Sequence, residues 1–149
     1  MPPEGADVSG LQASVATILR VMKITETSFR VAHRELNFSP PDLQSLRFIA
    51  QNPGCRSGEL AAYLGVVPTT ATSVVDRLVK RGLVSRTRPE SDRRSVALTL
   101  TEDGREAFAR IDAEEKQTMR VMLDALPDAD REGFVRAMAQ IAEHVSKIR

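Results

Sequence analysis

The sequence predicts a mainly α-helical protein that carries one small β-hairpin. Apolar residues recur at helical spacing near both ends of the chain, two short helices are expected in the middle, and two β-prone segments follow them. The chain has 149 residues, of which 42% are hydrophobic and 28% are charged. A chain of this size and composition folds as a single domain with its own core, without help from disulfides.

A long first helix is expected over residues 11–36, because its apolar side chains form one stripe. The stripe consists of Leu11, Val15, Ile18, Met22, Phe29 and Leu36. A second helix follows Ser39–Asp42, which supplies an N-cap, prolines suited to a first turn, and a carboxylate near the positive end of the helix dipole. This helix is expected to end at Asn52–Gly54.

The middle of the chain predicts two short helices and then a hairpin. One helix covers Ser57–Leu64, and the next starts at Pro68 and closes at Gly82. Ala71, Val74, Val75, Leu78 and Val79 are the inward positions of the second of these helices. Residues 83–88 and 95–100 are typical of strands, and the polar segment 89–94 connects them.

Two further helices are expected at the C-terminal end. Thr101–Gly104 caps a helix that continues to about Leu126, and Pro127 starts the last one. The apolar residues of the last helix are Phe134, Met138, Ile141, Val145 and Ile148, at helical spacing. The stripes of the first and last helices are too long for a small helical unit to cover, which favours a dimer interface.

The net charge of +1 hides an uneven distribution. Residues 41–100 carry +4, whereas residues 101–149 carry −3. Between Arg77 and Arg94, seven basic residues face only Glu90 and Asp92. A basic middle segment is typical of a nucleic-acid contact, although a solvated surface explains many such runs equally well.

The pair of short helices has the size and spacing of a helix-turn-helix, and the outward face of its second helix suits a DNA groove. That face carries hydroxyls first and cations last, which donate to phosphates and bases: Thr69, Thr72, Ser73, Arg77 and Lys80, with Asp76 among them. The hairpin tip adds Arg93 and Arg94 at the height of a minor groove. Asp92 is interpreted either as an ion-pair partner of these arginines or as a turn residue bonded to its own backbone.

These residues resemble the MarR family of winged helix-turn-helix transcriptional regulators. The motifs are Gly58–Gly65 (GELAAYLG), Val74–Val84 (VVDRLVKRGLV), Asp92–Arg94, Leu98–Thr101 and Gly104. The resemblance implies one MarR-like domain over 1–149, with a DNA-binding part at 37–100 and dimerisation helices at 11–36 and 101–149. It implies a homodimeric regulator, expected to be a repressor, that binds double-stranded DNA at an inverted repeat.

The resemblance also assigns individual residues. The recognition helix matches Pro68, Thr69, Thr70, Thr72, Ser73 and Arg77, and the wing matches Arg86, Arg88, Asp92, Arg93 and Arg94. One departure is Val67, where many members have a Ser or Thr cap; its loss costs the helix start about 1 kcal/mol.

Family members typically respond to a small molecule, often a phenolic or amphipathic anion, in a cleft beside the DNA-binding region. The candidates for that cleft here are Phe29, His33, Phe38, Leu46 and Arg47. A second branch of the family senses oxidation through a cysteine. Cys55 is the single candidate, next to a cation that favours its thiolate, but it does not match the position used by that branch, and packing is the preferred interpretation.

The sequence indicates no enzyme, no cofactor and no metal site. It has two histidines far apart, no Gly-rich phosphate loop, no HExxH and no Gly-x-Ser-x-Gly. No membrane span or secretory signal is predicted, and one cysteine suits the cytoplasm. A winged helix that contacts only proteins remains the alternative to a DNA-binding one.

Overall fold

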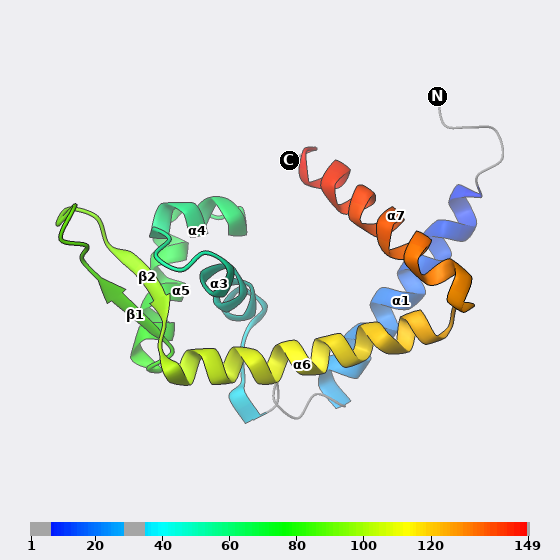
Figure 1. Cartoon of the computed structure of the whole chain (residues 1–149), viewed down its shortest axis with the longest axis horizontal. Helices are drawn as coiled ribbons and strands as arrows, with labels where there is room; N and C mark the ends of the chain where they lie inside the picture. Colours follow the sequence, from blue (N-terminus) through cyan, green and yellow to red (C-terminus); the bar gives the residue numbers. More distant parts are fainter. Residues whose placement is uncertain (1–6, 29–34, 149) are drawn as a thin grey trace. The chain divides into compact units, whose positions relative to one another are not determined.

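The computed structural model describes residues 7–28 and 35–148, and it confirms the predicted fold class. The order of elements is α1, α3, α4, α5, β1, β2, α6 and α7, mainly helical with one two-stranded antiparallel sheet (Figure 1). The chain forms two compact units, Met1–Ile111 and Asp112–Arg149, which we call the first and second units. No helix among the described residues is long and apolar enough to cross a membrane.

Helix α1 (Val8–Ser28) covers most of the helix predicted over 11–36. Residues 29–34 lie outside the described part of the chain. Of the apolar side chains that were expected to share one stripe, Leu11, Val15 and Ile18 are exposed in the single chain, whereas Leu36 is half-buried against the core. Exposed apolar side chains that follow one another along a helix form a surface suited to a further contact.

Three helices at the predicted positions follow: α3 (Pro40–Gln51), α4 (Ser57–Leu64) and α5 (Pro68–Lys80). Helix α3 starts with a capping box, in which Ser39 Oγ accepts from the Asp42 amide at 3.4 Å and Asp42 Oδ2 accepts from the Ser39 amide at 3.0 Å. Helix α4 ends at Gly65, whose φ of 67° is the left-handed conformation that favours glycine.

The hairpin is shorter than predicted. Strand β1 is Val84–Thr87 and strand β2 is Ala97–Leu100, with Val84 opposite Leu100. Strand β2 also pairs on its other side with Cys55. The Gly54 amide donates to the Leu98 carbonyl, and the Leu98 amide donates to the Cys55 carbonyl, both at 2.8 Å. The loop before α4 therefore anchors the hairpin, which the sequence pattern did not predict.

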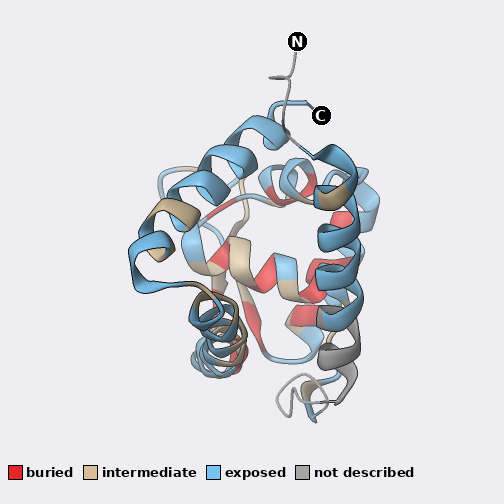
Figure 2. Cartoon of the chain, turned by 90° about the vertical axis from the view of Figure 1, so that its right-hand side faces the viewer, coloured by how far each residue is buried: buried red, intermediate tan, exposed pale blue. Residues whose placement is uncertain are grey.

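The core of the first unit lies between α3, α4, α5 and the hairpin, where the buried residues of Figure 2 concentrate. Ala71, Val74, Val75 and Leu78 are buried and Val79 is half-buried, so the predicted inward face of α5 is confirmed. The other large, fully buried side chains are Leu46, Ile49, Leu60, Leu98 and Ile111. This packing holds α5 with its opposite face in solvent.

Helix α6 (Glu102–Asp124) starts against the end of α5. The Thr101 hydroxyl donates to the Gly82 carbonyl at 2.6 Å and accepts from the Gly104 amide at 3.0 Å, which confirms Thr101 as the cap. Gly104 lies so close to the Leu83 backbone that an added Cβ would be 2.0 Å from the Leu83 carbonyl oxygen. The hairpin and α6 are thus joined through one cap and one glycine.

The second unit contains the end of α6 and helix α7 (Asp128–Ser146). Arg131 closes the connection between them: its Nε donates to the Leu123 and Leu126 carbonyls at 3.0 and 3.2 Å, and its Nη1 lies 3.0 Å from Asp128. Helix α7 buries no residue in the single chain, and Met138, Ile141 and Val145 are exposed.

Candidate nucleic-acid interface

The outward face of α5 presents small hydroxyls at its N-terminal end. Thr69, Thr70, Thr72 and Ser73 are all exposed. The Thr72 and Ser73 hydroxyls donate to the carbonyls four residues earlier, each at 3.0 Å, so they present their oxygens outward as acceptors. Val67 is the N-cap, and it supplies no side-chain hydrogen bond because its side chain is apolar. The helix start therefore keeps backbone donors that an external acceptor can satisfy.

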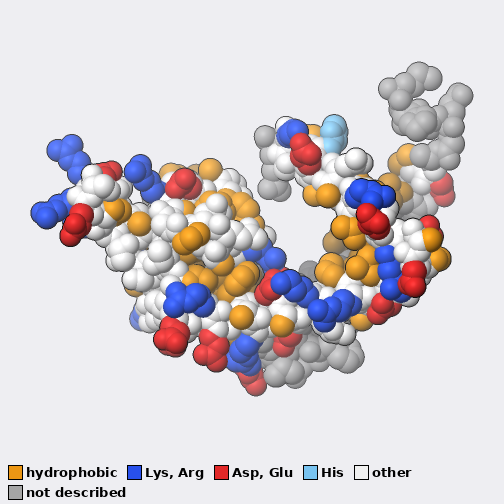
Figure 3. All heavy atoms as spheres, in the orientation of Figure 1, with side chains coloured by type: hydrophobic (Ala, Val, Ile, Leu, Met, Phe, Trp, Pro, Cys, Tyr) orange, Lys and Arg blue, Asp and Glu red, His pale blue; other side chains and the backbone are white. Residues whose placement is uncertain are grey.

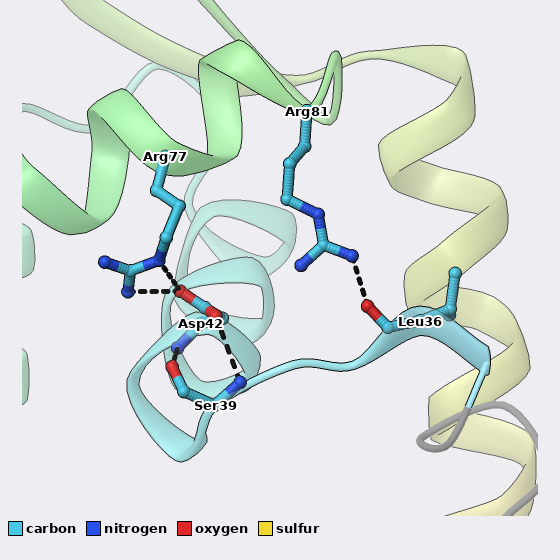
Figure 4. A network of polar contacts seen from close by, with 5 residues as sticks. All are labelled: Leu36, Ser39, Asp42, Arg77 and Arg81. Atoms are coloured by element: carbon cyan, nitrogen blue, oxygen red, sulfur yellow. Dashed lines mark hydrogen bonds and ion pairs between the residues drawn. The ribbon is translucent and has the colours of Figure 1, made fainter.

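Arg77 lies on the same helix but is attached to α3. Its Nε and Nη2 donate to Asp42 Oδ1 at 3.1 and 2.6 Å, while Asp42 Oδ2 is held by the Ser39 amide (Figure 4). The Asp42 side chain is 4% exposed and that of Arg77 is 48% exposed. Arg77 was predicted on the outward face of this helix, and its side chain is exposed; the sequence did not predict that one edge of its guanidinium is occupied by a buried carboxylate.

This contact controls the charge state of Asp42. Burial by itself raises the pKa of the carboxyl, but the hydrogen bonds from Arg77 and Ser39 outweigh burial and hold the pKa below its usual value of 3.8. Asp42 is thus ionised at neutral pH. A buried carboxylate that satisfies both a helix cap and an arginine ties α5 to α3.

One turn after Arg77, the C-cap residue of α5, Arg81, holds the segment that precedes α3. Its Nη2 donates to the Leu36 carbonyl (Figure 4). Its Cζ lies 4.2 Å from the centre of the Phe38 ring. Arg77 and Arg81 together fix the orientation of α5 relative to residues 36–42.

Two groups of wing arginines differ in their partners. Arg86 is paired with Asp76 of α5, so it joins β1 to this helix. Arg88, Arg93 and Arg94 are exposed, and their guanidinium groups have no hydrogen bond or ion pair within the described part of the chain. Basic side chains gather at the hairpin end of the molecule in Figure 3. Free arginines of this kind are suited to a polyanion.

Asp92 shapes the hairpin tip. Its Oδ1 accepts from the Arg94 amide at 3.1 Å, and its Oδ2 lies 3.6 Å from Arg56 Nη2. The Arg94 amide is the main reason why the pKa of Asp92 is lowered. Of the two interpretations of Asp92, the turn residue is confirmed; the guanidinium that faces its carboxylate belongs to Arg56, not to Arg93 or Arg94.

The residues predicted for an effector cleft lie in different surroundings. Phe29 and His33 are outside the described residues. Leu46 is fully buried in the core, Phe38 lies under Arg81, and Arg47 is half-buried on α3. A separate hollow of about 390 Å³ opens between α3, β2 and the start of α6. It is lined by Ile49, Ala50, Pro53, Thr99, Leu100, Arg105 and Phe108. It is apolar apart from Arg105 and the Thr99 hydroxyl, which suits a flat amphipathic anion.

Cys55 is buried, and its surroundings disfavour the thiolate. Burial is the main cause that raises the pKa of the thiol, and Glu59 adds to it. The prediction that Arg56 favours the Cys55 thiolate is wrong, because the Arg56 side chain extends toward Asp92. The packing interpretation of Cys55 agrees with this burial.

Two helices joined by a glycine turn and followed by an antiparallel hairpin define a winged helix-turn-helix protein. Residues 38–96 match the model of the MarR family. The HTH-type transcriptional repressor Rv2887 of Mycobacterium tuberculosis is 28% identical over 124 residues, which are 83% of this chain and 89% of the relative. In this region the chain resembles the MarR family, and the relatives that it matches are transcriptional regulators, not enzymes.

Solved structures share the fold. The crystal structure of Rv2887 in complex with p-aminosalicylic acid has a TM-score of 0.64 at 28% identity and covers 92% of this chain and 99% of that one. Streptococcus pneumoniae FabT in complex with DNA has a TM-score of 0.81 at 21% identity and covers 96% of this chain and 100% of that one.

Sequence reasoning missed two contacts in the candidate interface. Asp42 was interpreted only as a dipole partner of α3, and Arg56 was considered only for its effect on Cys55. Asp42 and Arg77 are separated by 35 residues, so no local spacing indicates their contact. The signal available in the sequence was a carboxylate at the third position of a helix, which the cap alone already explained.

Proposed function

We propose that this protein is a DNA-binding transcriptional repressor that acts as a homodimer on an inverted-repeat operator. The observation that carries the proposal is the free arginine set Arg88, Arg93 and Arg94 on the hairpin that follows the hydroxyl-bearing helix α5. The DNA complex of FabT, which has the same fold, supports this assignment. A repressor role is supported by the name of the relative Rv2887.

In this proposal the recognition helix enters a major groove and the wing follows the backbone into the neighbouring minor groove. The contacting residues are Pro68, Thr69, Thr70, Thr72, Ser73 and Arg77 from the helix, and Arg88, Arg93 and Arg94 from the wing. Arg86 and Asp92 act by holding the wing in place, since their side chains are engaged within the protein. The DNA-binding part covers residues 37–100.

The dimer is proposed to form through residues 11–36 and 101–149. Its support is the apolar surface that α1 and α7 leave in solvent, which includes Leu11, Val15, Ile141 and Val145. Surfaces of this kind are covered in a stable protein, and a two-fold dimer covers two copies at once. Two winged helices then read half-sites about one DNA turn apart. The lone buried Cys55 fits the reducing cytoplasm, where we place the protein.

We propose that a flat aromatic anion modulates the affinity for DNA. The p-aminosalicylic acid complex of Rv2887 supports the ligand class, and the hollow beside Arg105 and Phe108 supports the place. In this proposal the residues that line the hollow take the place of the effector-cleft residues predicted from the sequence. p-Aminosalicylate is the probe, and Arg105→Ala is the variant that should lose its effect on DNA release.

Fluorescence anisotropy with operator selected from randomised duplex DNA tests the main proposal. Specific affinity should fall steeply with salt, and Arg94→Ala should reduce the slope of log K against log salt by about 1 per half-site while the dimer persists. Equal slopes for Arg94→Ala and wild type would contradict the wing assignment. If the wild type enriches no sequence, the winged helix is a protein-contact module instead.

Light scattering on a size-exclusion column tests the dimer. Truncation after Leu126 removes α7 and should leave a chain that no longer dimerises. A truncated chain that stays dimeric and binds operator would refute the proposed interface.

A further inference from the structure

Arg77 presents only one of its two hydrogen-bonding edges to the protein. A guanidinium has a side edge, formed by Nε and one Nη, and an end edge, formed by the two Nη atoms. Asp42 Oδ1 accepts from Nε and Nη2, which uses the side edge. In Figure 4 the remaining nitrogen of Arg77 points away from Asp42. The end edge is therefore open on a side chain that is 48% exposed.

Asp42 is a rigid support for this arrangement. Its side chain is 4% exposed, and its second oxygen is fixed by the Ser39 amide at the start of α3. Because both oxygens are occupied, the carboxylate cannot rotate to follow Arg77, and the guanidinium plane is set by the protein before any ligand arrives. An arginine held in this way loses less conformational freedom when it binds than a mobile one does.

The same contact makes Arg77 less suited to bind phosphate than the other arginines are. The buried carboxylate neutralises its charge nearby, whereas Arg88, Arg93 and Arg94 stay unneutralised in the described part of the chain. A phosphate attracts net positive charge, but a base edge requires oriented donors. The open end edge matches the O6 and N7 acceptors of guanine in the major groove.

We propose that Arg77 reads a guanine in each half-site and that Asp42 is the positioning residue that aims it. This rests on the proposed DNA-binding function and adds the base and the residue pair that select it. Arg77 lies on the outward stripe of α5 together with Ser73 and Thr70, at helical steps of four and seven residues, so it reaches the same groove as they do.

The test is operator selection with matched variants. Wild type, Arg77→Lys, Asp42→Asn and Ser39→Ala are each selected on randomised duplexes, and circular dichroism verifies that each variant is folded. Arg77→Lys keeps the charge but loses the planar fork, so it should lose roughly tenfold or more of the preference for guanine at one position per half-site, with other positions unchanged. Asp42→Asn should weaken the preference at the same position.

Ser39→Ala is the control, because it weakens the α3 cap on the Ser39 side without removing the carboxylate that holds Arg77. It should keep the wild-type preference. Replacement of the guanine by 7-deazaguanine, which lacks the N7 acceptor, should weaken wild type but not Arg77→Lys.

The outcomes separate the two levels of the proposal. If the wild type selects an operator but Arg77→Lys preserves every base preference, or lowers affinity equally for all sequences, guanine reading by Arg77 is refuted and DNA binding stands. If Asp42→Asn keeps the wild-type preference at that position, the positioning role of Asp42 is refuted. If the wild type selects no sequence at all, the proposed function itself fails.

Discussion

Replacement of Gly104 by alanine should destabilise the first unit, although alanine is the better helix former. The Cβ would lie 2.0 Å from the Leu83 carbonyl oxygen and 2.9 Å from its carbonyl carbon, and both are backbone atoms. That oxygen also accepts from the Thr101 amide at 3.0 Å, so a shift of Leu83 strains the cap of α6. Overpacking of this kind costs roughly 3 kcal/mol, and alanine returns about 1 kcal/mol of helix propensity.

The expected net loss is about 2 kcal/mol, or a midpoint of thermal unfolding lower by roughly 4–8 °C in a chain of this length. Urea unfolding followed by circular dichroism measures it. Gly58→Ala is the matched control, because Gly58 also lies in a helix of the first unit but has no atom within 4 Å of an added Cβ. It should be neutral or stabilising by up to about 1 kcal/mol. A Gly104→Ala variant as stable as Gly58→Ala would refute the packing argument.

Three further outcomes are expected. The pKa of Asp42 is lower in the folded protein than its usual value, so its contribution to the free energy of unfolding is complete well above pH 3.8 and is lost as the pH falls through the folded pKa. The difference in the free energy of unfolding between wild type and Asp42→Asn should be about 1–3 kcal/mol at pH 7 and should shrink in acid titration. A difference that does not depend on pH would contradict this. The Cys55 thiol, buried and with a raised pKa, should react with a thiol reagent at pH 7 far more slowly in the native than in the urea-unfolded protein, and Cys55→Ser should leave DNA release by peroxide unchanged. Arg56→Ala should change the free energy of unfolding by less than about 1 kcal/mol, because the Arg56–Asp92 pair is exposed on both sides; a larger loss would show that the wing tip depends on it.

Local signals account for the elements that were predicted correctly. Caps act within four residues, so their effect can be predicted from the local sequence. Examples are Ser39 before two prolines, Gly65 after a short helix and Thr101 before an acidic turn. The inward face of α5 follows from one helical period in the same way. The pairing of Cys55 with Leu98 was not predicted, since it joins segments 43 residues apart through backbone groups that every residue carries.

Charged side chains show the limit of such reasoning. The sequence placed Arg77, Arg86 and Asp92 on exposed surfaces of the correct elements, but their partners are Asp42, Asp76 and Arg56. A long side chain reaches several carboxylates or guanidinium groups at comparable sequence distance, and the choice among them depends on separations in space.

The sequence by itself determined the order of the helices and the hairpin, because caps, glycines and apolar periods act over a few residues. Its motifs also carry the resemblance to a family of regulators. Only the tertiary structure decided which arginines remain free for a polyanion and which are held within the protein. The physical reason is that an ion pair forms wherever packing brings two groups within about 4 Å, and the packing of α3 against α5 is a property of the folded core.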